Sequence, residues 1–314
     1  MANFFTKLLF GESEQTEEQK NEHNFDVFKY DGIKAAKIGK NKYAIRCFQE
    51  ALDIREDVEV LEHLTQVYTK EDRLEDAIET AGRLVHIEPE NVPVLLLHAN
   101  LNYMAGNYDQ VIADCNKSME LDPAEVKAHY MAGRAKKMKG DPIGAIVNLS
   151  QAITLKDDYA EAWLLRAEIM LETGDYADGL QDAAKALELV PEEENAYLVR
   201  GKLQEASGKP DLAEKDSRHI IELNPFNEQA YLQLGNLYIA REQPDEAINL
   251  LNEAIELKPD FARAYHERGR ARLMKGDKAG SLEDMKKAME LGEDTAHING
   301  NYSNFEDMYK NRPL

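Results

Sequence analysis

Apolar residues recur along the chain at three- and four-residue intervals, the spacing of amphipathic helices. The predicted helices are about a dozen residues long and come in pairs. One predicted stripe joins Tyr197, Gly201 and Gln204. Another consists of Ala247, Leu251, Ala254 and Ile255. The pattern predicts an all-α fold built from helical hairpins.

Prolines after these helices set the period of the pattern. Their intervals are 34, 68, 34 and 34 residues, at Pro89, Pro123, Pro191, Pro225 and Pro259. The skipped position is Asp157, which lies in a segment of the same local sequence. Glycines and other small residues recur in the same frame, so about eight units are predicted over residues 25–295. A fixed period of this length indicates a repeat architecture.

The repeating residues resemble the tetratricopeptide repeat, whose pattern runs W-x-x-L-G-x-x-Y, then A-x-x-x-F, then A and P. The fullest matches are Trp163 with Ala167 and Gly174-Asp175-Tyr176, and Tyr231, Leu234, Gly235 and Tyr238 with Ala247, Ala254 and Pro259. The resemblance implies an α-α superhelical solenoid whose first helices line a concave surface. Because one hairpin cannot bury its own apolar face, neighbouring repeats are expected to stabilise one another.

The resemblance also implies which first-helix positions line a peptide-binding groove: the second, fifth, ninth, twelfth and thirteenth of each repeat. The candidates selected from these positions are Leu96, Asn100, Tyr103, Lys127, Tyr130, Arg134, Lys137, Leu164, Leu171, Lys202, Asn236 and Arg270. The set of Lys, Asn, Asn, Lys and Arg with which some family members clamp the acidic tail of heat-shock chaperones is absent.

Three of the groove candidates are basic and lie in the fourth repeat: Lys127, Arg134 and Lys137. They are expected either to hold an acidic group of a peptide that crosses the third to fifth repeats, or to pair with Glu168 and Glu172 of the next repeat. A second basic site is Arg263 with Arg270.

Two positions of the repeat change together. The seventh is basic where the twenty-third is acidic, which pairs Arg166 with Asp182, Arg200 with Asp216, Arg268 with Asp284 and His98 with Asp114. Repeats without the base also lack the acid, as in Leu64 with Thr80, Ala132 with Asn148 and Leu234 with Leu250. The correlation predicts a partly buried, structural ion pair between the two helices of each such repeat.

The two ends differ from the array. Residues 1–10 contain an apolar cluster at helical spacing, of Phe4, Phe5, Leu8, Leu9 and Phe10, and residues 11–24 are polar and acidic, which predicts a flexible linker within an N-terminal segment 1–24. The apolar cluster is interpreted either as a helix that folds back over the first repeat or as a docking peptide for a partner or membrane. Residues 296–314 are predicted to cap the last repeat, with a helix starting at Ser303.

Composition narrows the functional class. The formal charge of −21 disfavours nucleic acid and anionic lipid as partners. No apolar run reaches the roughly 20 residues of a membrane span, so no stable insertion is expected. Two cysteines, Cys47 and Cys115, provide no disulfide framework, and a cytoplasmic protein is expected.

No pattern in the sequence indicates catalysis, a cofactor or a metal. His129 takes the place that Trp163 has one repeat later and is predicted to pack. The sequence therefore predicts a non-catalytic protein-interaction scaffold that binds a peptide or helix, with an acidic group, in its concave groove. The alternative is a regulatory or assembly subunit that docks a larger complex through its convex face and N-terminal segment.

Overall fold

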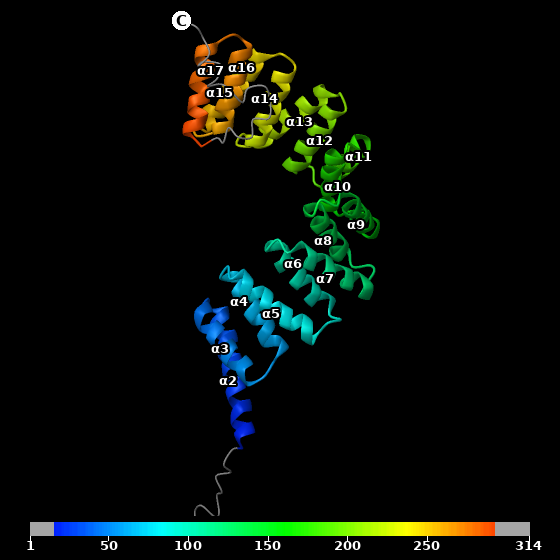
Figure 1. Cartoon of the computed structure of the whole chain (residues 1–314), viewed down its shortest axis with the longest axis vertical. Helices are drawn as coiled ribbons and strands as arrows, with labels where there is room; N and C mark the ends of the chain where they lie inside the picture. The colour runs from blue at the N-terminus through cyan, green and yellow to red at the C-terminus, as the bar shows by residue number, and fades with distance from the viewer. Residues whose placement is uncertain (1–15, 293–314) are drawn as a thin grey trace, which may run out of the picture. The chain divides into compact units, whose positions relative to one another are not determined.

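The computed structural model describes residues 16–292, and these form sixteen α-helices and no strand (Figure 1). Contacts divide the chain into two units, residues 1–156 and 157–314. Four hairpins make up the described part of each unit. Those of unit 1 are α2 (Glu17–Lys37) with α3 (Asn41–Ile54), α4 (Val58–Lys70) with α5 (Leu74–Ile87), α6 (Val92–Met104) with α7 (Tyr108–Leu121), and α8 (Val126–Met138) with α9 (Pro142–Leu155).

Unit 2 has the same organisation. Its hairpins are α10 (Ala160–Thr173) with α11 (Tyr176–Leu189), α12 (Glu194–Ala206) with α13 (Pro210–Leu223), α14 (Glu228–Ala240) with α15 (Pro244–Leu257), and α16 (Ala262–Met274) with α17 (Lys278–Glu290). The eight predicted repeats are therefore confirmed. Most first helices end in a tight turn, where Gly106 and Gly140 adopt positive φ angles of 78° and 75° that favour glycine.

Small residues allow the two helices of a hairpin to pack closely. A Cβ atom on Gly133 of α8 would lie 2.8 Å from Cγ of Leu149 on α9, and one on Gly32 of α2 would lie 2.6 Å from the Phe48 ring on α3. Neither glycine accepts a larger side chain without moving its neighbour.

Successive hairpins in a unit join through a second face of the first helix. Ala128, Ala132 and Ala135 of α8 are buried with Val111 and Cys115 of α7. The same contact recurs in unit 2, where Ala264 of α16 packs with Leu251, Ala254 and Ile255 of α15. The apolar stripe predicted for α15 is thus confirmed, and it faces the next repeat.

The four predicted pairs all meet inside their hairpins, three of them as arginine–aspartate ion pairs and the fourth as a hydrogen-bond contact between His98 and Asp114. The closest nitrogen–oxygen distances are 2.6 Å for Arg166–Asp182, 2.7 Å for Arg200–Asp216, 2.6 Å for Arg268–Asp284 and 2.8 Å for His98–Asp114. Each aspartate is buried, and each arginine donates through Nε and Nη2 to both carboxylate oxygens. The hydrogen bonds that Arg200 donates to Asp216 raise the pKa of Arg200 further above its usual value.

An aromatic ring covers each of these arginines. The guanidinium carbon lies 5.0–5.1 Å from the ring of the residue three positions earlier, which is Trp163, Tyr197 or Tyr265. Trp163 also donates from Nε1 to the carbonyl of Asp157 at 2.9 Å. His129 is buried, as its predicted packing role requires, and its Nε2 lies 3.1 Å from the equivalent carbonyl, that of Pro123.

The first helix begins earlier than expected. Residues 17–24 belong to α2, so the predicted flexible linker over 11–24 is wrong in its second half. Thr16 accepts a hydrogen bond from the Gln19 backbone while the Gln19 side chain accepts one from the Thr16 backbone, a capping box that starts the helix. The expectations for residues 1–10 and for a helix at Ser303 lie outside the described residues.

We expect Arg200→Ala to lower the stability of unit 2 by roughly 3–5 kcal/mol, because Asp216 would remain buried without its partner. Urea unfolding followed by circular dichroism measures the change. Lys202→Ala, at an exposed site on the same helix, is the matched control and should shift stability by at most about 0.5 kcal/mol.

The seventh repeat supplies a second control, because it has Leu234 and Leu250 at the two positions. The double variant Arg200→Leu with Asp216→Leu should therefore recover most of the stability that Arg200→Ala loses. A double variant as unstable as Arg200→Ala would show that the loss does not come from an unpaired aspartate.

Candidate functional site

The groove candidates of unit 1 lie on α6 and α8, which are the first helices of adjacent repeats and contact one another. Three of them meet around one guanidinium. The Arg134 side chain on α8 lies 4.1 Å from the ring centroid of Tyr103 on α6 and 5.6 Å from that of Tyr130, one turn earlier on α8. We call Tyr103, Tyr130 and Arg134 the tyrosine–arginine cluster.

No carboxylate of the described part of unit 1 forms an ion pair with Arg134. The residue three positions earlier, which could reach it along the helix, is Met131, and Met131 packs on the core of α6–α8. Two other bases of this repeat do have acceptors in unit 1: Lys136 of α8 donates to Asn148, and Lys139, which follows α8, pairs with Asp109. Within the described part of unit 1, the Arg134 guanidinium therefore contacts two aromatic rings and no carboxylate.

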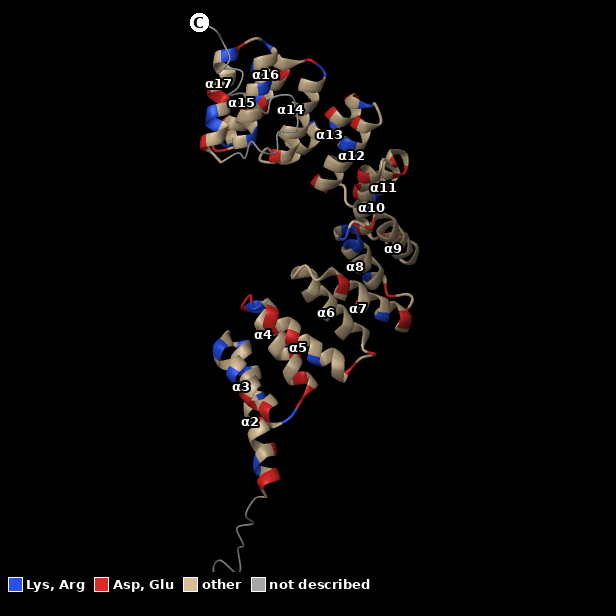
Figure 2. Ribbon diagram, viewed as in Figure 1, with Lys and Arg blue, Asp and Glu red and all other residues tan. Residues whose placement is uncertain are grey.

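The remaining candidates of unit 1 surround this cluster. Lys127 and Asn100 are exposed, and Lys137 is half-buried. Leu96 is half-buried and packs on the same core cluster as Tyr103, so it supports the fold as well as the surface. Figure 2 shows the basic residues of α8.

In unit 2 the candidates are spread over four first helices. Leu164 and Leu171 of α10 pack on the core that α10 shares with α11 and α12. Lys202 is exposed on α12. Glu168, which was considered as a partner of the fourth-repeat bases, accepts a hydrogen bond from Asn195 of its own unit at 2.9 Å.

The basic site around Arg270 already has internal partners. Nη1 of Arg270 donates to Oδ1 of Asn236 at 3.2 Å and pairs with Glu267. Burial opposes ionisation of Glu267, but its hydrogen bond with His266 and the charge of Arg270 outweigh that and hold its pKa below the usual value. Arg270 is the ninth residue of the eighth repeat, and Arg134 is the ninth residue of the fourth. They differ in the residue three positions earlier, which is Glu267 before Arg270 and Met131 before Arg134.

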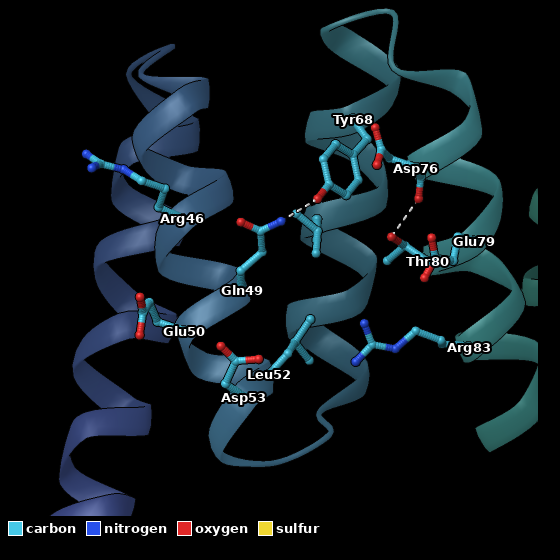
Figure 3. Close-up of a pocket in the computed structure, with 11 residues that line it drawn as sticks. Arg46, Gln49, Glu50, Leu52, Asp53, Tyr68, Asp76, Glu79, Thr80 and Arg83 are labelled. Carbon is cyan, nitrogen blue, oxygen red and sulfur yellow. Dashed lines mark hydrogen bonds between the residues drawn. The ribbon is translucent and has the colours of Figure 1, made fainter.

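A polar hollow of about 430 Å³ lies on the second-helix side of unit 1, between α3, α4 and α5 (Figure 3). Its lining includes Arg46, Asp53 and Arg83, and Nε2 of Gln49 donates to the Tyr68 hydroxyl at 3.0 Å. Arg83 also pairs with Glu56. No sequence pattern predicted this hollow, because its lining residues come from three helices and share no motif.

The structure also contains contacts between repeats that the sequence analysis missed. Asp109 pairs with Lys139, Asp211 with Arg241 and Asp245 with Lys275. The partners are 30 residues apart in each case, and this constant offset is the signal from which they could have been predicted. Cys47 and Cys115 are both buried and unbonded, and burial raises the pKa of Cys115 to about 12.

Among the described residues, no helix is long and apolar enough to cross a membrane. The same residues contain no group of three or more His, Cys, Asp or Glu side chains placed to hold a metal ion.

Comparisons with known proteins agree with the repeat register. A family model described as tetratricopeptide repeat matches residues 130–194, and one described as TPR repeat matches residues 235–276. A comparison with curated proteins finds no match.

The solved structures that match this chain include two with TM-scores above 0.5, which share its fold. A tetratricopeptide repeat protein from Parabacteroides merdae ATCC 43184 is 18% identical, with a TM-score of 0.62 over 81% of this chain and 97% of its own. PilF of Pseudomonas aeruginosa is 15% identical, with a TM-score of 0.54 over 70% and 99%. MamA is 28% identical, with a TM-score of 0.46 over 51% and 93%.

The hairpins, their register and these matches define an all-α superhelical repeat fold. The chain is a tetratricopeptide-repeat protein. Such proteins generally bind protein or peptide partners, and their repeats typically form non-catalytic scaffolds.

The lowered pKa of Glu267 predicts a pH-dependent contribution to the stability of unit 2. Its folded pKa lies below the unfolded value of about 4.3, so the contribution is complete above that pH and is lost as the pH falls through the folded pKa. Glu267→Gln should therefore unfold at lower urea than the wild type at pH 7, and this difference should shrink below about pH 4. A constant difference at all pH values would contradict the assignment.

Proposed function

We propose that this protein is a non-catalytic scaffold that binds an acidic peptide on the first-helix surface of the third and fourth repeats, at the tyrosine–arginine cluster. The observation that carries the proposal is that Arg134 lies against two tyrosine rings and has no carboxylate partner in the described part of unit 1. The proposal places the ligand within unit 1 and does not depend on the fifth repeat.

The contact of Arg134 with the tyrosine rings leaves its N–H donors available to a ligand. A cation–π contact uses the face of a guanidinium, whereas its five N–H donors lie in the plane and project from the edge. No hydrogen bond of Arg134 to another described residue of unit 1 consumes these donors. A carboxylate that approaches the edge can therefore accept two parallel hydrogen bonds from a side chain whose orientation is already restricted.

The surroundings suit a peptide with one apolar side chain near its acidic group. Tyr103, Tyr130 and Leu96 are half-buried and offer aromatic and aliphatic surface. Lys127 lies seven residues before Arg134, about 10 Å along α8, and can attract a second acidic group. In a chain with a formal charge of −21, such a basic surface would guide an acidic ligand to one place.

We also propose that the protein is cytoplasmic. This location is supported by the two cysteines, which are buried and unbonded, as thiols are in a reducing compartment.

The test begins with partners captured from cell extract by the full chain, followed by affinity measurements on a fluorescent peptide from the captured partner. Arg134→Ala should weaken binding by roughly 5- to 150-fold, which corresponds to about 1–3 kcal/mol for loss of a hot-spot side chain. Arg270→Ala, at the same repeat position, should bind as the wild type because Arg270 already pairs with Glu267.

A triple variant, in which Lys127, Arg134 and Lys137 become alanine, should lose more affinity while its circular dichroism spectrum stays helical. If folded Arg134→Ala and the triple variant both bind like the wild type, the ligand does not use the cluster, and Arg263 with Arg270 becomes the site to test.

A new carboxylate that pairs with Arg134 inside the protein should weaken peptide binding, as removal of the Arg134 charge does. Met131→Glu places an acid three residues before Arg134, as Glu267 stands before Arg270, and should weaken peptide binding. Met131→Gln is the control of equal size without the charge. Equal affinity for the two variants would show that the guanidinium edge does not meet the peptide.

One observation favours the alternative of an assembly subunit. Helix α9 carries no charged residue, and its outward Ile143 and Val147 are 76% and 64% exposed. If this second-helix surface docks a larger complex, Ile143→Asp with Val147→Asp should abolish partner capture and leave peptide binding at Arg134 unchanged. Partner capture by that variant at the wild-type level would remove this alternative.

A further inference from the structure

Helix α9 presents a stripe of exposed side chains without charge, which we call the α9 stripe. It consists of Ile143, Val147, Gln151 and Thr154, which lie within about 80° of one another around the helix. Each of the other second helices that the structure describes carries at least four charged residues, and α9 carries none. Figure 2 shows this contrast, because α9 is tan along its length.

The position of Ile143 is acidic in several other repeats. It is Asp109 in the third repeat, Asp211 in the sixth and Asp245 in the seventh, and each of these acids pairs with a base 30 residues further along. Thirty residues after Ile143 the sequence has Thr173. The acid and the base of this contact are therefore both replaced, and an isoleucine that is 76% exposed stands in place of the acid. Apolar side chains on a surface that is otherwise charged are typical of an interaction site.

The charge of the chain favours a second copy as the partner of the α9 stripe. Two chains that each carry a formal charge of −21 repel one another, so they approach most readily where neither presents a charged side chain. Among the described second helices, only α9 offers such a surface. Whatever covers Ile143 and Val147 must also be uncharged, because burial of an unpaired charge against them costs free energy. A second α9 meets this requirement.

The two ends of α9 are complementary when two copies of the helix pack antiparallel. The N-cap is Asp141 and the C-cap is Lys156, so a two-fold axis at the middle of the helix brings each Asp141 level with the Lys156 of the other copy. Ile143 of one copy then faces Leu155 of the other, which is 37% exposed. The two Val147 side chains lie about 4.5 Å apart along the helix axis.

We propose that two copies of this protein associate through the α9 stripe, with the two helices antiparallel about a two-fold axis. Such a contact uses the same surface on both copies, so assembly stops at the dimer. One pair of helices forms an interface at the low end of the known range, below about 1,200 Å², so we expect a weak dimer with a Kd on the order of 10 µM. The proposal is independent of the peptide site on α6 and α8.

Sedimentation equilibrium of the purified full chain at increasing concentration measures the association. Ile143→Asp with Val147→Glu should raise the Kd at least tenfold. Acids occur at both positions in other repeats, so the variant should keep the helical circular dichroism spectrum of the wild type. Ala177→Asp with Gln181→Glu is the matched control, because it adds the same charge at the equivalent exposed positions of α11. The control should change the Kd less than twofold.

Two results would overturn the proposal. A wild-type chain that stays monomeric at all concentrations would assign the α9 stripe to a different partner. An equal loss of association in the α9 variant and the α11 control would show that added charge weakens the dimer wherever it is placed.

Single cysteine variants test the antiparallel arrangement. The two residues at position 147 lie about 4.5 Å apart along the axis and those at position 143 about 16 Å apart, whereas a disulfide requires Cα atoms within about 7 Å. Val147→Cys should therefore form a disulfide between two chains at least tenfold faster than Ile143→Cys. The native Cys47 and Cys115 are buried and do not compete. Equal rates, or no linked chains from either variant, would overturn the proposed arrangement.

Discussion

The structure depends, within each unit, on the burial of one apolar face of a first helix against the second helix before it. Ala128, Ala132 and Ala135 of α8 make this contact with α7, and the same positions make it throughout each unit. A hairpin alone would leave the face in water, so the stability of a repeat depends on its neighbours. The face also explains why the first repeat is unusual, since Val27 and Tyr30 of α2 retain its apolar character and are exposed, without a described neighbour.

Arginine serves two different purposes in this framework. At the seventh position of a repeat it stacks on an aromatic ring and uses its N–H groups on a buried aspartate, as Arg200 does with Asp216. At the ninth position of the fourth repeat, Arg134 has the ring contacts without the aspartate. The first arrangement satisfies the donors inside the fold and is structural, whereas we propose that the second presents them to a ligand. The difference lies in the partners of the guanidinium and not in its exposure alone.

Much of this could be predicted from the sequence because the repeat presents the same positions several times. The ion pairs were predicted because Arg166, Arg200 and Arg268 each occur with an aspartate at a constant offset. The contact between the three residues of the tyrosine–arginine cluster could not be predicted, although each residue was a groove candidate. The approach of Tyr103 to Arg134 depends on how α6 and α8 meet across a repeat boundary. The start of α2 was missed because the polar composition of residues 11–24 obscured the capping box of Thr16 and Gln19.

The central claim is that the Arg134 guanidinium meets a carboxylate of the bound peptide. A thermodynamic cycle measures this directly: the affinities of wild type and Arg134→Ala are determined for the peptide and for an analogue with its acidic residue changed to the amide. The account predicts a coupling free energy of at least about 1.5 kcal/mol, in the range of close charge pairs at interfaces. A coupling of zero, with both changes weakening binding independently, would contradict it.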